Sequence, residues 1–177
     1  MNEKILNRNE IIEKLAKTYL EFLNSIKWDN ELYLKGINEG KNKFLSNAHL
    51  HLCGDKYEIS NYHSKEALFL LNNQTGIDNS GKLVFEHMVP KTKYIQKPCE
   101  EMAKSGELTF NFIYDLLKKY WFIATITKEE EKLLKTSKVM PTDWGKIGHI
   151  ARYEKTKIQL IQNPMWVEIN NNVGENK

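Results

Sequence analysis

Apolar residues recur at steps of three and four along the first part of this chain. Between residues 9 and 26 they fall at Ile11, Ile12, Leu15, Tyr19, Phe22, Leu23 and Ile26, with charged residues between them. This spacing puts them on one face of a helix, and a face of that width needs to be buried. The same periodicity predicts helices from Asp29 to Phe44 and from Phe110 to Tyr120. The chain must therefore fold around packed helices.

Two short β-prone segments interrupt the helical pattern. The first covers residues 82–87 and ends before Pro90, which cannot donate a hydrogen bond to a neighbouring strand. The second covers residues 122–126 and runs into a capping box that starts at Thr127 and predicts a helix over residues 127–135. We therefore expect an α+β fold that is mainly helical, with a small antiparallel sheet of two or three strands.

The length of the chain sets its domain organisation. A chain of 177 residues has the size of one ordinary domain. We expect a single domain over residues 1–169, with a helical N-terminal part over residues 1–81 and an edge strand at residues 166–169. The polar residues 170–177 are expected to form a flexible tail.

Composition excludes several classes of protein. Apolar residues make up 41% of the chain and charged residues 28%, which is typical of a soluble globular protein. The two cysteines cannot build a disulfide framework, and the sequence offers neither a secretory signal nor an apolar stretch long enough to span a membrane. These observations predict a cytoplasmic protein with no membrane partner.

The basic residues are almost all lysines. Of 26 Lys and Arg residues only Arg8 and Arg152 are arginines, which leaves 24 lysines, and the net charge is +3. Lysine presents a hydrated point charge rather than the bidentate fork of arginine. Base-edge recognition by arginine is therefore not expected, and a nucleic-acid role requires the lysines to gather at one place.

The segment Phe85-Glu86-His87-Met88-Val89-Pro90 carries the strongest chemical signal in the chain. It places a carboxylate beside an imidazole at the end of a strand, where a loop can expose both. A neutral imidazole can take a proton from an attacking water, and a carboxylate can hold a divalent cation beside a phosphate. Adjacent strand residues point to opposite sides, so Glu86 and His87 can take different roles.

The order of elements around this segment resembles the ββα-metal unit of HNH (His-Me finger) endonucleases, whose first strand ends in an Asp-His or Glu-His pair. The resemblance covers residues 82–135, with an insertion between the two strands. It implies that His87 is the general base and that Glu86, with Glu130 or Glu131 of the following helix, binds Mg²⁺ or Mn²⁺. The segment lacks the Asn and the Cys-x-x-Cys zinc knuckles that many members of the family carry.

The function implied by this resemblance is metal-dependent cleavage of DNA by a restriction or mobile-element nuclease. Lys91, Lys93 and Lys97 follow the histidine closely and suit a phosphate backbone, and Arg152 is a further candidate for phosphate contact. The prediction requires these lysines to lie on the side of Glu86 and His87.

Other interpretations of the same residues stay open. Glu86 and His87 can form a satisfied polar pair at a strand end, and acidic residues 129–131 are common in a first helical turn, where the helix dipole favours them. The chain would then be a non-enzymatic phage- or plasmid-encoded factor that binds protein or nucleic acid. The helices within residues 1–81 can form core, a DNA-contacting arm or the face of a homodimer.

A second candidate metal site lies at His49, His51 and Cys53. Their alternation puts the three side chains on one face if the segment is extended. Two imidazoles and a thiolate suit zinc, with His63, Cys99 or water as the fourth ligand. The spacing matches none of the common structural zinc patterns, and the residues can equally form the polar face of an ordinary strand.

Overall fold

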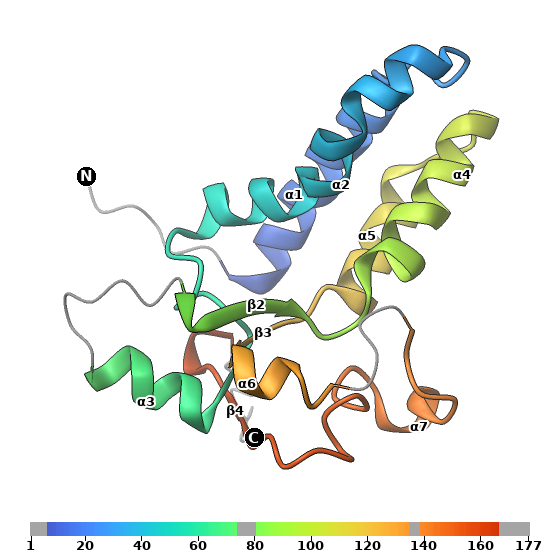
Figure 1. Cartoon of the computed structure of the whole chain (residues 1–177). Coiled ribbons are helices and arrows are strands. Elements are labelled where there is room, and N and C mark those ends of the chain that lie inside the picture. The colour runs from blue at the N-terminus through green and yellow to red at the C-terminus, as the bar shows by residue number, and fades with distance from the viewer. Residues whose placement is uncertain (1–6, 74–80, 135–138, 167–177) are drawn as a thin grey trace, which may run out of the picture.

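The computed structural model describes residues 7–73, 81–134 and 139–166. Its strands form a small sheet, and its helices lie on the two sides of that sheet (Figure 1). One side carries four helices, namely α1 (Arg8–Asn24), α2 (Glu31–Cys53), α4 (Lys97–Ser105) and α5 (Phe110–Tyr120). The other side carries three helices, namely α3 (Lys65–Asn73), α6 (Lys128–Glu131) and α7 (Trp144–Ile147).

The first helices begin where the sequence provides caps. Asn7 accepts a hydrogen bond from the backbone of Glu10, whose side chain bonds back to Asn7, and this capping box starts α1. Asn30 caps α2 in the same acceptor role. Residues 48–53, which the zinc interpretation took as extended, belong to α2, because the helix continues past Phe44 until Gly54, whose φ of 97° favours glycine.

The sheet has four strands in the order β2-β3-β1-β4. Their bounds are Tyr62–Ser64 for β1, Leu83–His87 for β2, Ile123–Thr127 for β3 and Leu160–Gln162 for β4. β2 is antiparallel to β3, β4 is antiparallel to β1, and β1 is parallel to β3. The predicted mainly helical α+β class is confirmed, and the sheet is mixed rather than purely antiparallel.

The sequence missed β1 and β4 because each has three residues, which is too short for a periodic signal. Contacts with residues far away in the sequence hold β1 in the sheet. The side chain of Asn61 accepts a hydrogen bond from the backbone of Ile123 at 2.9 Å, and this bond ties the start of β1 to the start of β3. Pairing between such distant segments depends on tertiary contacts.

Several C-terminal expectations differ from the structure. The helix after β3 is four residues long and ends at Glu131, so the expected helix over 127–135 is shortened. Trp166 lies in the 3₁₀-helix η3 (Pro164–Trp166) and not in a strand. The rest of the expected strand at 166–169 and the tail at 170–177 lie outside the described residues.

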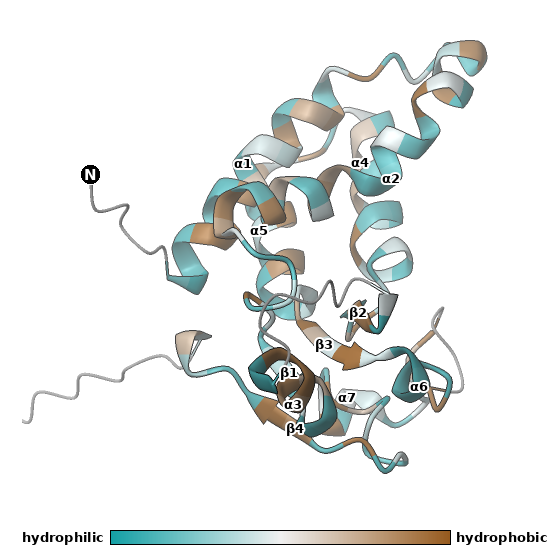
Figure 2. Ribbon diagram, turned by 60° about the vertical axis from the view of Figure 1, so that its left-hand side comes forward, coloured by the Kyte–Doolittle hydropathy of each residue, from teal (hydrophilic) through white to brown (hydrophobic). Residues whose placement is uncertain are grey.

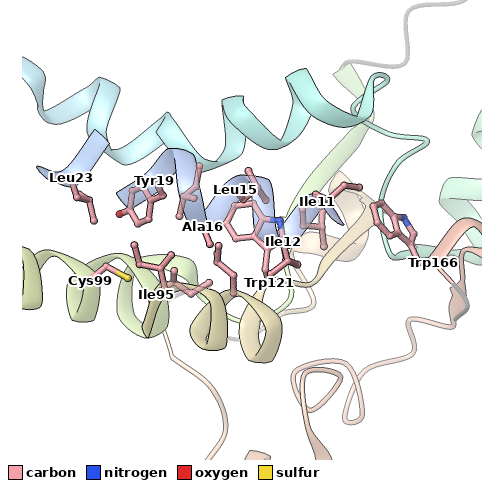
Figure 3. Close-up of a cluster of buried hydrophobic side chains, with 14 of the residues drawn as sticks. Ile11, Ile12, Leu15, Ala16, Tyr19, Leu23, Ile95, Cys99, Trp121 and Trp166 are labelled. Atoms are coloured by element: carbon pink, nitrogen blue, oxygen red, sulfur yellow. The ribbon is translucent and has the colours of Figure 1, made fainter. Parts of the chain in front are cut away.

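The main hydrophobic core lies between α1 and the pair α4 and α5 (Figure 3). α1 contributes Ile12, Leu15 and Tyr19 to it, and Trp121 packs against them from the end of α5. Colouring by hydropathy shows apolar bands on these helices and a strongly apolar β3 (Figure 2). The periodicity of residues 9–26 thus predicted the buried face of α1 correctly.

A second apolar cluster lies across the sheet, where Met88, Ala124 and Ile126 pack with Tyr153 and Ile158. Both cysteines are free thiols. Among the described helices, none is both long and apolar enough to cross a bilayer.

Candidate functional site

The end of β2 sends its last two side chains to opposite faces of the sheet, as alternation along a strand predicts. Phe85 and His87 face the four helices, and the His87 ring lies 4.8 Å from the ring of Trp121, centroid to centroid. Glu86 points to the other face and meets Arg152. The two adjacent residues therefore have separate surroundings.

A cavity of about 620 Å³ opens beside the end of β2. Its lining consists of Glu86, His87, Pro90, Lys91, Thr92, Lys93 and Lys97. The three lysines that the sequence predicted to accompany His87 are thus gathered around it. We refer to this cavity as the lysine pocket.

One part of the lysine pocket lies on a π-helical turn, η2 (Thr92–Gln96), which continues directly into α4. Pro90 starts this segment by accepting backbone hydrogen bonds from Lys93 and Tyr94. A π-helical turn is wider than an α-helical one and is frequent at functional sites. Here it carries Thr92 and Lys93 of the pocket lining.

His87 is held as a neutral imidazole. Burial lowers the pKa of His87 well below its ordinary value, and the charges of Lys91 and His49 lower it further. The Nε2 atom of His87 lies 3.1 Å from the hydroxyl oxygen of Ser46, which comes from α2. The neutral form of His87 therefore dominates at neutral pH, and its unprotonated nitrogen can accept a hydrogen bond.

Ser46 connects His87 to Lys91. The ammonium group of Lys91 donates a hydrogen bond of 2.7 Å to Ser46 Oγ and one of 3.0 Å to the backbone carbonyl of Asn42. Burial lowers the pKa of Lys91. The sequence did not indicate Ser46 as a site residue. Its only local feature is its position on α2 four residues after Asn42, and many polar helix residues share such a spacing.

Glu86 is engaged by Arg152. Arg152 Nη1 donates to Glu86 Oε1 at 2.7 Å and to the backbone carbonyl of His87 at 3.0 Å. Burial raises the pKa of Glu86, the Arg152 charge opposes that rise, and the charge of Glu131 adds to it. Arg152 is 6% exposed, so it braces the end of β2 from the interior, whereas the sequence suggested a contact with nucleic-acid phosphate.

The carboxylates predicted to bind a metal have different contacts in the structure. Glu130 completes the capping box of α6 and accepts a hydrogen bond of 2.5 Å from Ser64. Glu131 is near enough to Glu86 for its charge to affect the pKa of Glu86. In the described parts of the chain, no group of three or more His, Cys, Asp or Glu side chains could hold a metal ion. Glu86 and Glu130 already have hydrogen-bond partners, and the binding of Mg²⁺ or Mn²⁺ by these carboxylates stays a prediction.

The three side chains of the candidate zinc site, His49, His51 and Cys53, do not all lie on one side of α2. Side chains two positions apart on a helix do not face each other. His49 is buried, and its Nδ1 accepts a hydrogen bond of 3.1 Å from Trp121 Nε1, whereas His51 is exposed. Cys99 lies in the core, and His63 contacts the backbone carbonyl of Tyr57. The extended geometry that the zinc interpretation requires of residues 49–53 is therefore not formed.

In comparisons with known proteins, no family model, curated protein or solved structure matches this chain. The functional argument consequently depends on the lysine pocket alone.

Proposed function

We propose that this protein binds the phosphate backbone of DNA in the lysine pocket and cleaves a phosphodiester bond there, with His87 as the general base. The single observation that carries the proposal is the position of His87 in a cavity lined by Lys91, Lys93 and Lys97. Cationic side chains attract a phosphodiester, and a neutral imidazole can take the proton of the attacking group.

The lysines differ in what they can contribute. Lys93 and Lys97 are exposed on η2 and at the start of α4, and so they can meet a phosphate from solution. Lys91 is half-buried and already positioned by Ser46 and Asn42. Lys93 and Lys97 therefore serve binding, while Lys91 stays close to the reacting group.

The need for Mg²⁺ or Mn²⁺ stays a prediction from the resemblance. Glu86 is the one carboxylate among the lining residues of the lysine pocket, and Arg152 already contacts it. The chemistry proposed for the pocket therefore uses side chains of this chain, and the assays include each metal and EDTA.

The second candidate function is a non-enzymatic nucleic-acid-binding factor. It is favoured by the engagement of Glu86 with Arg152 and of Glu130 with Ser64, because both carboxylates then have structural roles. On this alternative the lysines bind phosphate and His87 is part of the packing against Trp121.

A nicking assay on supercoiled plasmid separates the two functions. We expect wild-type protein to nick the plasmid and His87→Ala to be slower by about 10²- to 10⁴-fold, the usual contribution of a general base. Equal nicking by both proteins, or none by either in Mg²⁺, Mn²⁺ or EDTA, would contradict the nuclease.

Binding is measured on the same DNA over a range of salt concentrations. Lys93→Gln and Lys97→Gln should each weaken binding and reduce the slope of log affinity against log salt by about one. Lys14→Gln and Lys17→Gln, on the exposed face of α1, are matched controls that should change neither. Salt-dependent binding without nicking would favour the binding factor.

A further inference from the structure

The hydroxyl of Ser46 contacts both an imidazole and an ammonium group. Its hydroxyl oxygen lies 3.1 Å from His87 Nε2 and 2.7 Å from the Lys91 ammonium group. A hydroxyl within hydrogen-bond reach of an imidazole is the usual arrangement of an activated nucleophile. We propose that Ser46 is the nucleophile that attacks the phosphodiester, with His87 as its base. The inference rests on the proposed function.

The direction of the hydrogen bonds supports this role. An ammonium group has three donors and no acceptor, so Ser46 Oγ accepts from Lys91. The Ser46 proton is then free to point to His87 Nε2, the imidazole nitrogen at 3.1 Å. In this arrangement His87 is placed to remove the Ser46 proton while Lys91 stabilises the negative charge that develops on Oγ.

The lysine pocket ends beside this serine. His87 and Lys91 line the cavity, and both contact Ser46 Oγ, although Ser46 itself is not among the lining residues. Ser46 itself is half-buried rather than closed off. Asn42, one turn earlier on α2, holds Lys91 through its carbonyl and fixes the ammonium group beside the hydroxyl.

The reaction proceeds in two steps. Ser46 Oγ forms a bond to phosphorus, the bond from phosphorus to one sugar oxygen breaks, and the electron pair of that bond stays on the departing oxygen. The Ser46 proton moves to His87 Nε2 and then to the departing oxygen, which leaves as an alcohol. Water next gives a proton to His87 Nε2 while its oxygen forms a bond to phosphorus. The bond from phosphorus to Ser46 Oγ breaks, the proton passes from His87 to Oγ, and the second DNA end leaves with the phosphate.

Diisopropyl fluorophosphate tests the nucleophile without any DNA. An activated serine displaces fluoride from this reagent and keeps the diisopropylphosphoryl group, which peptide mass spectrometry locates. We expect the full-length protein to be modified at Ser46, with the rate falling by about 10²-fold or more in His87→Ala. Exposed Ser105, at the end of α4, is the internal control and should stay unmodified. An unmodified Ser46 would overturn the inference.

Plasmid nicking by Ser46→Ala, beside Ser105→Ala, completes the test. We expect Ser46→Ala to lose nicking by about 10²-fold or more and Ser105→Ala to nick like wild type. Undiminished nicking by Ser46→Ala would overturn the nucleophile and leave the proposed nuclease standing, with water attacking directly. Modification of Ser46 in a protein that never nicks DNA would support the activated serine and overturn the proposed nuclease. Circular dichroism establishes that each variant is folded.

Discussion

The two faces of the sheet bury different kinds of side chains. On the helical face, an apolar cluster built from Leu15, Tyr19, Ile113 and their neighbours fills the space between α1, α4 and α5. On the opposite face, the apolar cluster is smaller and lies beside the ion pair of Glu86 and Arg152. The first face stabilises the fold mainly through apolar packing, whereas the second holds Glu86 at the end of β2 through an ion pair.

This difference explains why the lysine pocket lies at the end of β2. His87 packs into the helical face and Glu86 is held by the polar contacts of the opposite face. Hydrogen bonds and ion pairs have preferred distances and angles, whereas the hydrophobic effect has no preferred direction. The strand end is consequently anchored on both sides, and the residues that follow it begin from a defined position.

The largest expected effect comes from breaking the helical face at Trp121. Trp121→Ala removes a ring that is 2% exposed and leaves the acceptor atom of His49 without its donor. We expect a loss of about 5 kcal/mol in the free energy of unfolding, the upper part of the range for such truncations, measured by urea denaturation. Phe69→Ala on α3, where the side chain is 63% exposed, is the control and should cost less than about 0.5 kcal/mol. Similar losses for both variants would contradict the assigned core.

A smaller effect is expected from breaking the polar contact on the opposite face. Arg152→Met leaves Glu86 half-buried without its cation and should lower the free energy of unfolding by about 3 kcal/mol at neutral pH. The double variant Glu86→Gln with Arg152→Met should recover most of that loss, because no uncompensated charge remains. If the double variant is as unstable as the single one, Arg152 acts through packing or through the His87 carbonyl instead of through Glu86.

The smallest effect concerns pH and distinguishes buried His49 from its exposed neighbour His51. Burial lowers the pKa of His49 from 6.5 to about 4. As pH falls below 6.5, the unfolded chain gains a proton that folded His49 does not accept until about pH 4, so stability present above pH 6.5 is lost on acidification. The loss from this one residue between about pH 7.5 and about pH 5 should be about 2 kcal/mol.

The measurement is the free energy of unfolding of His49→Gln and His51→Gln across that pH interval. Glutamine at position 49 retains an acceptor for Trp121 and removes the titrating group. The pH dependence should therefore decrease in His49→Gln and remain unchanged in His51→Gln. A residual slope is expected, because burial also lowers the pKa of His63, of His87 and of His149, whereas the raised pKa of Glu86 acts in the opposite direction.

Much of the helical part was predictable because its signals are local. The apolar spacing of residues 9–26 and 110–120 predicted buried faces of α1 and α5, and the Thr127 capping box predicted the start of α6. The alternation of Glu86 and His87 also follows from strand geometry alone. The sequence left the conformation of residues 48–53 open, because alternating histidines and leucines fit a strand as well as the last turns of a long helix.

The candidate site was predictable in part. The lysines of the pocket lie within ten residues of His87 along the chain, so a single turn and helix bring them together. Ser46 lies 41 residues before His87 and Arg152 lies 66 residues after Glu86. No periodicity or spacing connects such distant positions, and no common motif includes them.

The sequence by itself determined most of the helical segments, the short segment that ends in a carboxylate and an imidazole, and the lysines that follow it. Those properties depend on residues a few positions apart, which interact in any fold that forms the same element. The tertiary structure alone decided that Glu86 meets Arg152, that Ser46 and Lys91 meet His87, and that β1 and β4 complete the sheet. These contacts join distant segments, and they form because the packing of the helices and the sheet brings those segments together.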